Sequence, residues 1–265
     1  MKYLSKFLVL ITIIIFSCSK DEVSPEDEPQ EQQEQKEENE EPTEIDKSGN
    51  QLTTGASGPD LLTSEKFKSL HIEIGYVEGF KPDEEAIDLL LEFLEDRVYK
   101  PGGITYNMKS LQSSNQTPFD RSDWESIEDE HREKYNTENE IAVWIYFSDG
   151  KKDIGNGQTS SVKGTAYMNT SIIMYGESFN EFFEGSSLPK NMVIANTLRH
   201  EFGHLFGLVN LELEPTTNHE DPESSNHCTG ENCLMKAVKV WQSSQPEIHP
   251  LDDACLKDLQ SIGGK

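Results

Sequence analysis

The chain has 265 residues, of which 49 are Asp or Glu and 23 are Lys or Arg, so its formal net charge is −26. Such an acidic composition argues against a nucleic-acid binder, because phosphate binding requires a surplus of basic side chains. Only 34% of the residues are apolar, a low fraction for a chain that is globular throughout. At least one segment is therefore expected to be unfolded or strongly solvated.

The N-terminal residues have the pattern of an export signal. Basic residues precede an apolar run over residues 7–16, which is too short to span a bilayer as a helix. Residues 15–18 read I-F-S-C and resemble the lipobox of bacterial lipoproteins. The resemblance implies a signal peptide over residues 1–17, a lipid on Cys18, and an exported protein at the outer membrane or surface of a Gram-negative bacterium. An ordinary secretory signal with an incidental Cys is the alternative.

An acidic segment follows the export signal. Residues 21–47 contain 13 Asp or Glu and almost no apolar side chain, so they are expected to stay disordered and extended. Residues 48–66 are rich in Ser, Thr and Gly and are assigned to the same linker. The predicted tether covers residues 18–66, and a single folded domain is predicted over residues 67–265. The densest acidic run therefore lies in the tether, but residues 48–265 still carry −18.

From about Lys68 onward the pattern indicates mixed helices and strands. Alternating or continuous apolar runs predict strands, and apolar residues at helical spacing predict helices. The expected strands cover residues 70–77, 104–108, 141–147 and 164–175, and the expected helices cover 83–99, 121–135, 188–206 and 252–260. Residues 141–147 carry no charge and are expected to form a central strand. Residues 148–157 are rich in Gly and Asp and are expected to form a turn.

The helix expected at residues 188–206 contains a recognisable metal-binding pattern. It reads His200-Glu201-Phe202-Gly203-His204. Residues four apart lie on one face of a helix, so His200 and His204 can bind one metal ion with a third ligand from elsewhere. Glu201 can reach a water molecule held on that metal. This is the spacing that zinc peptidases use for two His ligands and a Glu general base.

The residues after this motif strengthen the interpretation. Residues 200–210 read H-E-x-x-H-x-x-G-x-x-N and resemble the metzincin clan of zinc peptidases. Gly207 matches the position at which the metzincin helix ends. That clan has His, or sometimes Asp, where this chain has Asn210. Asn is a poor zinc ligand, so the third ligand is expected elsewhere.

A second string supplies a candidate third ligand. Residues 227–235 read H-C-x4-C-x-M, which resembles the archaemetzincin signature, in which the third zinc His directly precedes the first Cys. The resemblance implies that His200, His204 and His227 bind zinc and that Met235 forms the turn beneath the metal. It also implies a loop inserted after the helix.

Two alternatives to His227 remain open at this stage. His219 lies in the same inserted loop, over residues 208–226, and competes as the third ligand. Asn210 is the last alternative, because it occupies the metzincin position. Sequence spacing does not show which of these side chains reaches the metal.

The resemblance also implies a fold class and an enzymatic activity. It implies an α+β, zincin-like domain with a mixed sheet, an active-site helix and an irregular C-terminal subdomain. It implies a zinc metallopeptidase, either an endopeptidase or an aminopeptidase, with a metal-activated water and Glu201 as general base. An edge strand within residues 164–174 is expected to align the peptide. We expect a monomer whose partners are a peptide or protein substrate and the membrane. The alternative is a non-catalytic, zinc-containing surface lipoprotein that binds a peptide or host component.

Three cysteines remain besides Cys18. In an oxidising compartment the simplest expectation is a disulfide between Cys228 and Cys233, which leaves Cys255 unpaired. A disulfide from Cys255 to either of the others, and a zinc site built from the three thiolates, are the alternatives.

Overall fold

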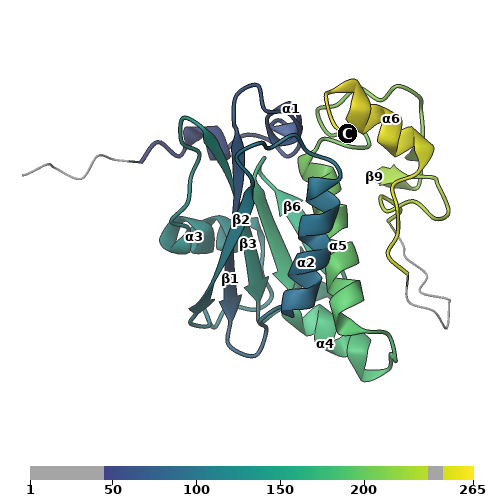
Figure 1. Ribbon diagram of the computed structural model, residues 1–265. Coiled ribbons are helices and arrows are strands. Elements are labelled where there is room, and N and C mark those ends of the chain that lie inside the picture. Colours follow the sequence, from purple (N-terminus) through teal and green to yellow (C-terminus); the bar gives the residue numbers. More distant parts are fainter. Residues whose placement is uncertain (1–44, 238–246) are drawn as a thin grey trace, which may run out of the picture. The chain divides into compact units, whose positions relative to one another are not determined.

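The computed structural model describes residues 45–237 and 247–265 (Figure 1). The predicted signal peptide, Cys18 and the acidic tether as far as residue 44 lie outside the described residues. The described part is a mixed α and β fold, as the alternation of patterns predicts. Within it, no helix has both the length and the apolar content that crossing a membrane requires.

A five-stranded mixed sheet forms the centre of the described domain. In spatial order its strands are β2 (Ile104–Leu111), β1 (Ser69–Val77), β3 (Glu140–Ser148), β7 (Ser171–Tyr175) and β6 (Gly164–Tyr167). The first four are parallel, and β6 is antiparallel to β7 at the edge. The prediction of a central strand at residues 141–147 is confirmed, because β3 lies in the middle and is buried from Ile141 to Ser148.

Helices cover both faces of this sheet. The helices of the described residues are α1 (Gly58–Leu62), α2 (Glu84–Glu95), α3 (Arg121–His131), α4 (Gly176–Glu184), α5 (Lys190–Leu205) and α6 (Asp253–Ser261), after a short 3-10 turn at Ser48–Asn50. In Figure 1, α2 and α5 lie side by side along the sheet, and α3 lies across from them. Side chains of β3 alternate accordingly: Val143 and Ile145 pack in the cluster with α2 and α5, and Trp144 packs with Trp124 of α3.

The region predicted as one strand over residues 164–175 folds differently. It forms β6 and β7, which are joined by a reversal in which Met168 has a φ of 51°. The buried Asn169 side chain stabilises this reversal by donating to Gly49 O at 2.9 Å and to Ser57 Oγ at 2.7 Å. Asn169, Thr170 and Ser171 interrupt the apolar pattern at this reversal, but the partners of Asn169 are distant in sequence.

Three further segments differ from the expected elements. The turn expected over residues 148–157 contains β4 (Lys152–Gly155), which forms a hairpin with β5 (Gln158–Ser160) just beyond it. Helix α4 precedes α5 and was not expected. The polar loop after α5 contains a short hairpin, β8 (Glu220–Asp221) and β9 (Ser224–Cys228). The two hairpins are short and polar, so periodicity alone gives little indication of them. Helix α4, in contrast, has Phe179, Phe182 and Phe183 at helical spacing.

The domain begins earlier than the predicted boundary at residue 67. Residues 48–66, predicted to be linker, are packed on the domain. The buried Asn50 amide donates to Ala142 O at 3.1 Å and to Thr170 Oγ1 at 3.0 Å, and Leu61 is fully buried in the core. The prediction was wrong because the segment is ordered by partners far along the chain rather than by its own composition.

This corrected boundary can be tested at Asn50. We expect Asn50→Ala to lower the free energy of unfolding by about 2–4 kcal/mol, because it leaves several buried polar partners without a hydrogen bond. Gln51→Ala, at an exposed neighbour, is the matched control and should change it by less than about 0.5 kcal/mol. Urea denaturation measures both. Equal midpoints for Asn50→Ala and the parent protein would show that this segment does not stabilise the domain.

Candidate active site

Helix α5 presents the motif predicted from the sequence. The helix begins after Pro189, and Phe206 is its C-cap. Gly207 follows with a φ of 87° and donates through its N–H to His204 O at 3.0 Å. A Cβ at Gly207 would lie 2.6 Å from Leu211 O, so only glycine fits this reversal. The turn sends the chain into the loop that carries His227.

The structure brings His200, His204 and His227 together. The Nε2 atoms of His200 and His204 lie 3.1 Å apart, and the His227 ring lies 5.3 Å and 5.2 Å from these two rings between centroids. The Nδ1–H of His200 donates to Leu234 O at 2.8 Å, and the Nδ1–H of His227 donates to Ser225 O at 2.8 Å. Donation through Nδ1 leaves Nε2 as the nitrogen that can bind a metal.

The three imidazoles fit a zinc ion. One ligand nitrogen from each lies within 4.8 Å of the others. Two nitrogens bound to one tetrahedral zinc lie roughly 3.4 Å apart, which agrees with the 3.1 Å between His200 and His204. Burial, and then the charges of His200 and His227, hold the pKa of His204 well below its usual value. His204 is therefore neutral, which is the form of histidine that binds metals.

Glu201 is buried beside this centre and is tied to the edge of the sheet. Its Oε2 accepts a hydrogen bond from Ala166 N, in β6, at 2.8 Å. Burial raises the pKa of Glu201 to about 7. Helix α5 packs against β6, and a Cβ at Gly164 would lie 2.8 Å from Glu201 Oε1. The carboxylate is therefore held in a defined position by both elements.

Met235 packs under the same helix. It is fully buried, and a Cβ on Gly203 would overlap its sulfur, so the glycine within the motif allows this contact. Met235 O accepts from Cys228 N at 2.8 Å, and Met235 N donates to Cys233 Sγ at 3.4 Å. This methionine therefore connects the histidine centre to the cysteines of the following loop.

The two alternative third ligands lie elsewhere. The Asn210 amide donates to the Glu220 carboxylate. His219 belongs to a separate group of potential ligands, in which its Nε2 lies 2.7 Å from Asp258 Oδ2. Among the described residues, only His227 joins His200 and His204 in one group of potential metal ligands.

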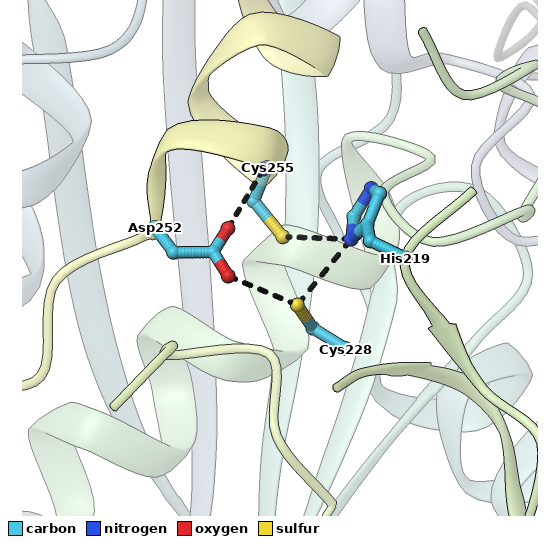
Figure 2. Close-up of side chains that lie close together, drawn as sticks. All are labelled: His219, Cys228, Asp252 and Cys255. Carbon is cyan, nitrogen blue, oxygen red and sulfur yellow. Dashed lines mark hydrogen bonds between the residues drawn. The ribbon is translucent and has the colours of Figure 1, made fainter. Parts of the chain in front are cut away.

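The separate group consists of His219, Cys228, Asp252 and Cys255, and Figure 2 shows the four side chains pointing toward one another. His219 Nδ1 lies 3.3 Å from Cys228 Sγ and 3.9 Å from Cys255 Sγ. Asp252 Oδ2 accepts from Cys228 Sγ at 3.2 Å. Cys233 is adjacent, with its Sγ 3.5 Å from Cys255 Sγ. We call these four residues and Cys233 the sulfur cluster. The cluster joins the loop after α5 to helix α6.

Surrounding groups suit the sulfur cluster to a metal. Gly230 N donates to Cys228 Sγ at 3.3 Å, a contact that favours the thiolate, whereas the neighbouring Cys233 raises the pKa of this thiol. Asp258 is fully buried and accepts from His219 Nε2 and, at 2.7 Å, from Thr216 N. This pairing leaves Nδ1 of His219 directed at the sulfurs. A carboxylate that orients a histidine in this way is typical of metal sites. Sequence analysis missed this role of His219 and Asp258, because only the fold places α6 beside the loop.

The structure corrects the predicted disulfide between Cys228 and Cys233. No disulfide joins cysteines in the described residues. Cys228 Sγ faces His219 and Asp252, and Cys233 Sγ faces Cys255, so the sulfur atoms share one cluster with polar side chains. The prediction considered the cysteines and their compartment alone, and it did not include the neighbouring histidine.

The histidine centre opens into a cleft. His200, Glu201, His204 and His227 line a cavity of about 700 Å³. Residues 164–166 of the edge strand β6 line the same cavity. The site therefore combines a potential metal centre, a buried carboxylate and an edge strand in a space large enough for several peptide residues.

Among known proteins, the chain is similar to solved structures. No family model matches the chain, and no curated protein matches it. An archaemetzincin from Methanopyrus kandleri is similar with a TM-score of 0.46 and 14% identity, over 74% of this chain and 96% of that one. The metalloproteinase-II from Bacteroides fragilis is similar with a TM-score of 0.40 and 16% identity, over 76% of this chain and 56% of that one. At these identities the likeness concerns the fold alone.

Proposed function

We propose that the chain is a zinc-dependent metallopeptidase. The observation that carries the proposal is the convergence of His200, His204 and His227 in a cleft that also holds Glu201. Three histidine ligands leave a coordination position open, whereas a structural zinc site is closed by four protein ligands. When bound there, zinc supplies a Lewis acid that polarises a carbonyl and lowers the pKa of water to about 7.

The chain's own residues supply the remaining chemistry. Glu201 takes the proton of the attacking water and passes it to the leaving amine. Its contact with Ala166 N holds the carboxylate in place before the substrate arrives. Strand β6 is the edge of the described sheet, so an extended peptide can add beside it through main-chain hydrogen bonds. The peptide bond would then lie beside the Glu201 carboxylate and the three histidines that would hold the metal.

A casein digest tests this proposal. Zinc-loaded protein is expected to cleave casein, and 1,10-phenanthroline is expected to abolish cleavage. His227→Ala should lose one zinc per chain and all measurable activity, because two histidines hold zinc poorly. His131→Ala, on α3 outside the site, is the control and should keep both. Zinc-loaded, folded protein that cleaves neither casein nor a peptide library would favour a peptide-binding protein instead.

The backbone beside Glu201 provides a second prediction. Gly164→Ala places a methyl group against the Glu201 carboxylate, so we expect kcat to fall by about 10²-fold as the base is displaced. Zinc content should not change. Gly185→Ala is the matched control, because nothing lies within 4 Å of the added Cβ at this position. Full activity in Gly164→Ala, measured by peptide hydrolysis, would contradict the assigned position of the base.

We also propose that the sulfur cluster holds a structural zinc. His219, Cys228 and Cys255 offer ligand atoms that already face one another, with Asp252 and Cys233 beside them. A closed site of this kind stabilises a fold and does not bind substrate. Here it would tie α6 to the loop that carries His227, so the proposed zinc would support the catalytic centre.

The lipid anchor remains a prediction from the sequence. Mass spectrometry of the N-terminal peptide of the mature protein should show a diacylglyceryl group on Cys18. Cleavage elsewhere, or an unmodified Cys18, would contradict the predicted location on a membrane surface.

A further inference from the structure

Basic side chains line the cleft of this acidic protein. Lys152, Lys163 and Lys236 all line the cavity, and Glu201 is the only carboxylate among its described lining residues. Residues 48–265 carry −18 in total, so lysines concentrate here against the overall charge of the domain. A cleft lined by one sign of charge attracts ligands of the opposite sign.

Lys152 and Lys163 have aromatic and hydroxyl neighbours, and the one carboxylate whose charge acts on either lysine is Glu201, beside Lys152. Lys152 Nζ donates to Thr165 Oγ1 at 3.4 Å, and Lys163 Nζ lies 4.4 Å from the centroid of the Phe182 ring. Neither lysine forms an ion pair with any residue that the structure describes. Lys236, in contrast, pairs with Glu231 at 3.1 Å.

The same two lysines are partly withdrawn from water. Burial lowers the pKa of Lys163, and it also lowers the pKa of Lys152 against the opposing attraction of Glu201. Keeping a partly desolvated ammonium group without an ion pair costs free energy, and a bound carboxylate would offset that cost. Both side chains are therefore well suited to an acidic ligand.

Their positions follow the edge strand along which a peptide would bind. Lys163 directly precedes β6, and Lys152 contacts Thr165 within β6. A peptide added to this edge places alternate side chains on opposite faces of the sheet. Glu201 contacts the next residue of the same strand, Ala166. The lysines thus lie within a few residues of the peptide bond that Glu201 would serve.

We infer that the cleft selects peptide segments with Asp or Glu beside the scissile bond, and that Lys152 and Lys163 pair with those carboxylates. This inference rests on the proposed peptide-cleaving function for the path of the peptide. It adds a substrate class, acidic peptides, and names two residues that determine specificity.

Binding of two matched peptides tests the inference without requiring turnover. Fluorescent nonapeptides that differ only in Glu or Gln at the central positions are titrated into zinc-loaded Glu201→Gln protein. We expect the Glu peptide to bind about 10-fold more tightly at low salt, with the preference falling as salt rises. Adding Lys152→Met and Lys163→Met should abolish the preference, because methionine keeps the apolar stem and removes the charge.

Lys151→Met is the matched control. Lys151 is the neighbour of Lys152 on the same hairpin, but it pairs with Glu181 and does not line the cleft. Its substitution should leave the preference intact. Equal binding of the two peptides, no binding of either, or a preference that survives in the Lys152→Met/Lys163→Met protein would each overturn the inference.

The casein digest separates this inference from the proposed function. If parent protein cleaves casein but shows no preference for the Glu peptide, only the inference fails. If the Glu peptide binds through the two lysines but nothing is cleaved, the proposed function fails and the cleft is a binding site for acidic peptides.

Discussion

Replacing Glu201 with Gln is expected to lower kcat by about 10²–10⁴-fold and to leave zinc content unchanged. Glutamine has nearly the same shape, and its amide oxygen can still accept the hydrogen bond from Ala166 N. It cannot accept a proton from water. The variant therefore removes the general base while leaving the three histidines and the edge strand in place.

Steady-state hydrolysis of one peptide, with zinc measured on the same samples, checks this expectation. Glu85→Gln, at an exposed position of α2, is the matched control and should keep parental kcat. Parental activity in zinc-loaded Glu201→Gln would show that another group takes the proton. Loss of zinc together with activity would instead give Glu201 a role in holding the metal.

The second large effect is expected at the sulfur cluster. His219→Ala should release one zinc per chain and lower the free energy of unfolding by about 3 kcal/mol or more, because metal binding contributes directly to folding. For a domain of this size that corresponds to a fall in Tm of roughly 6–12 °C. The zinc held by His200, His204 and His227 should remain bound.

Zinc content and thermal unfolding, measured together, distinguish the two metal sites. Asp258→Asn should have a weaker effect, with zinc affinity at the cluster reduced about 10–100-fold, because it disturbs the orientation of His219 without removing a ligand. His131→Ala again serves as the control. If His219→Ala keeps all its zinc and its Tm, the cluster is not a metal site.

Much of the fold and of the histidine centre could be predicted because the signals are local. The uncharged run at residues 141–147 indicates a central strand, and β3 is the middle strand of the sheet. The four-residue spacing of His200 and His204 requires only helical geometry, and α5 provides it. His227 was named from a signature string, and the structure places it beside both.

The remaining features depend on contacts between distant segments. Asn50 is held by hydrogen bonds to Ala142 and Thr170. The composition of residues 48–66 therefore wrongly indicates a linker. His219 is directed to the sulfur cluster by Asp258, which lies 39 positions later in α6. No periodicity or spacing encodes these pairs. The same holds for the lysines of the cleft, because Lys152 reaches it from a hairpin that was expected to be a turn.

Diffraction from zinc-loaded crystals, with data collected on both sides of the zinc absorption edge, tests the central claim most directly. The account predicts an anomalous peak at the centre of His200, His204 and His227, with a coordination position facing the cleft and no fourth protein ligand. No peak among these histidines, or a fourth protein ligand that closes the site, would contradict it.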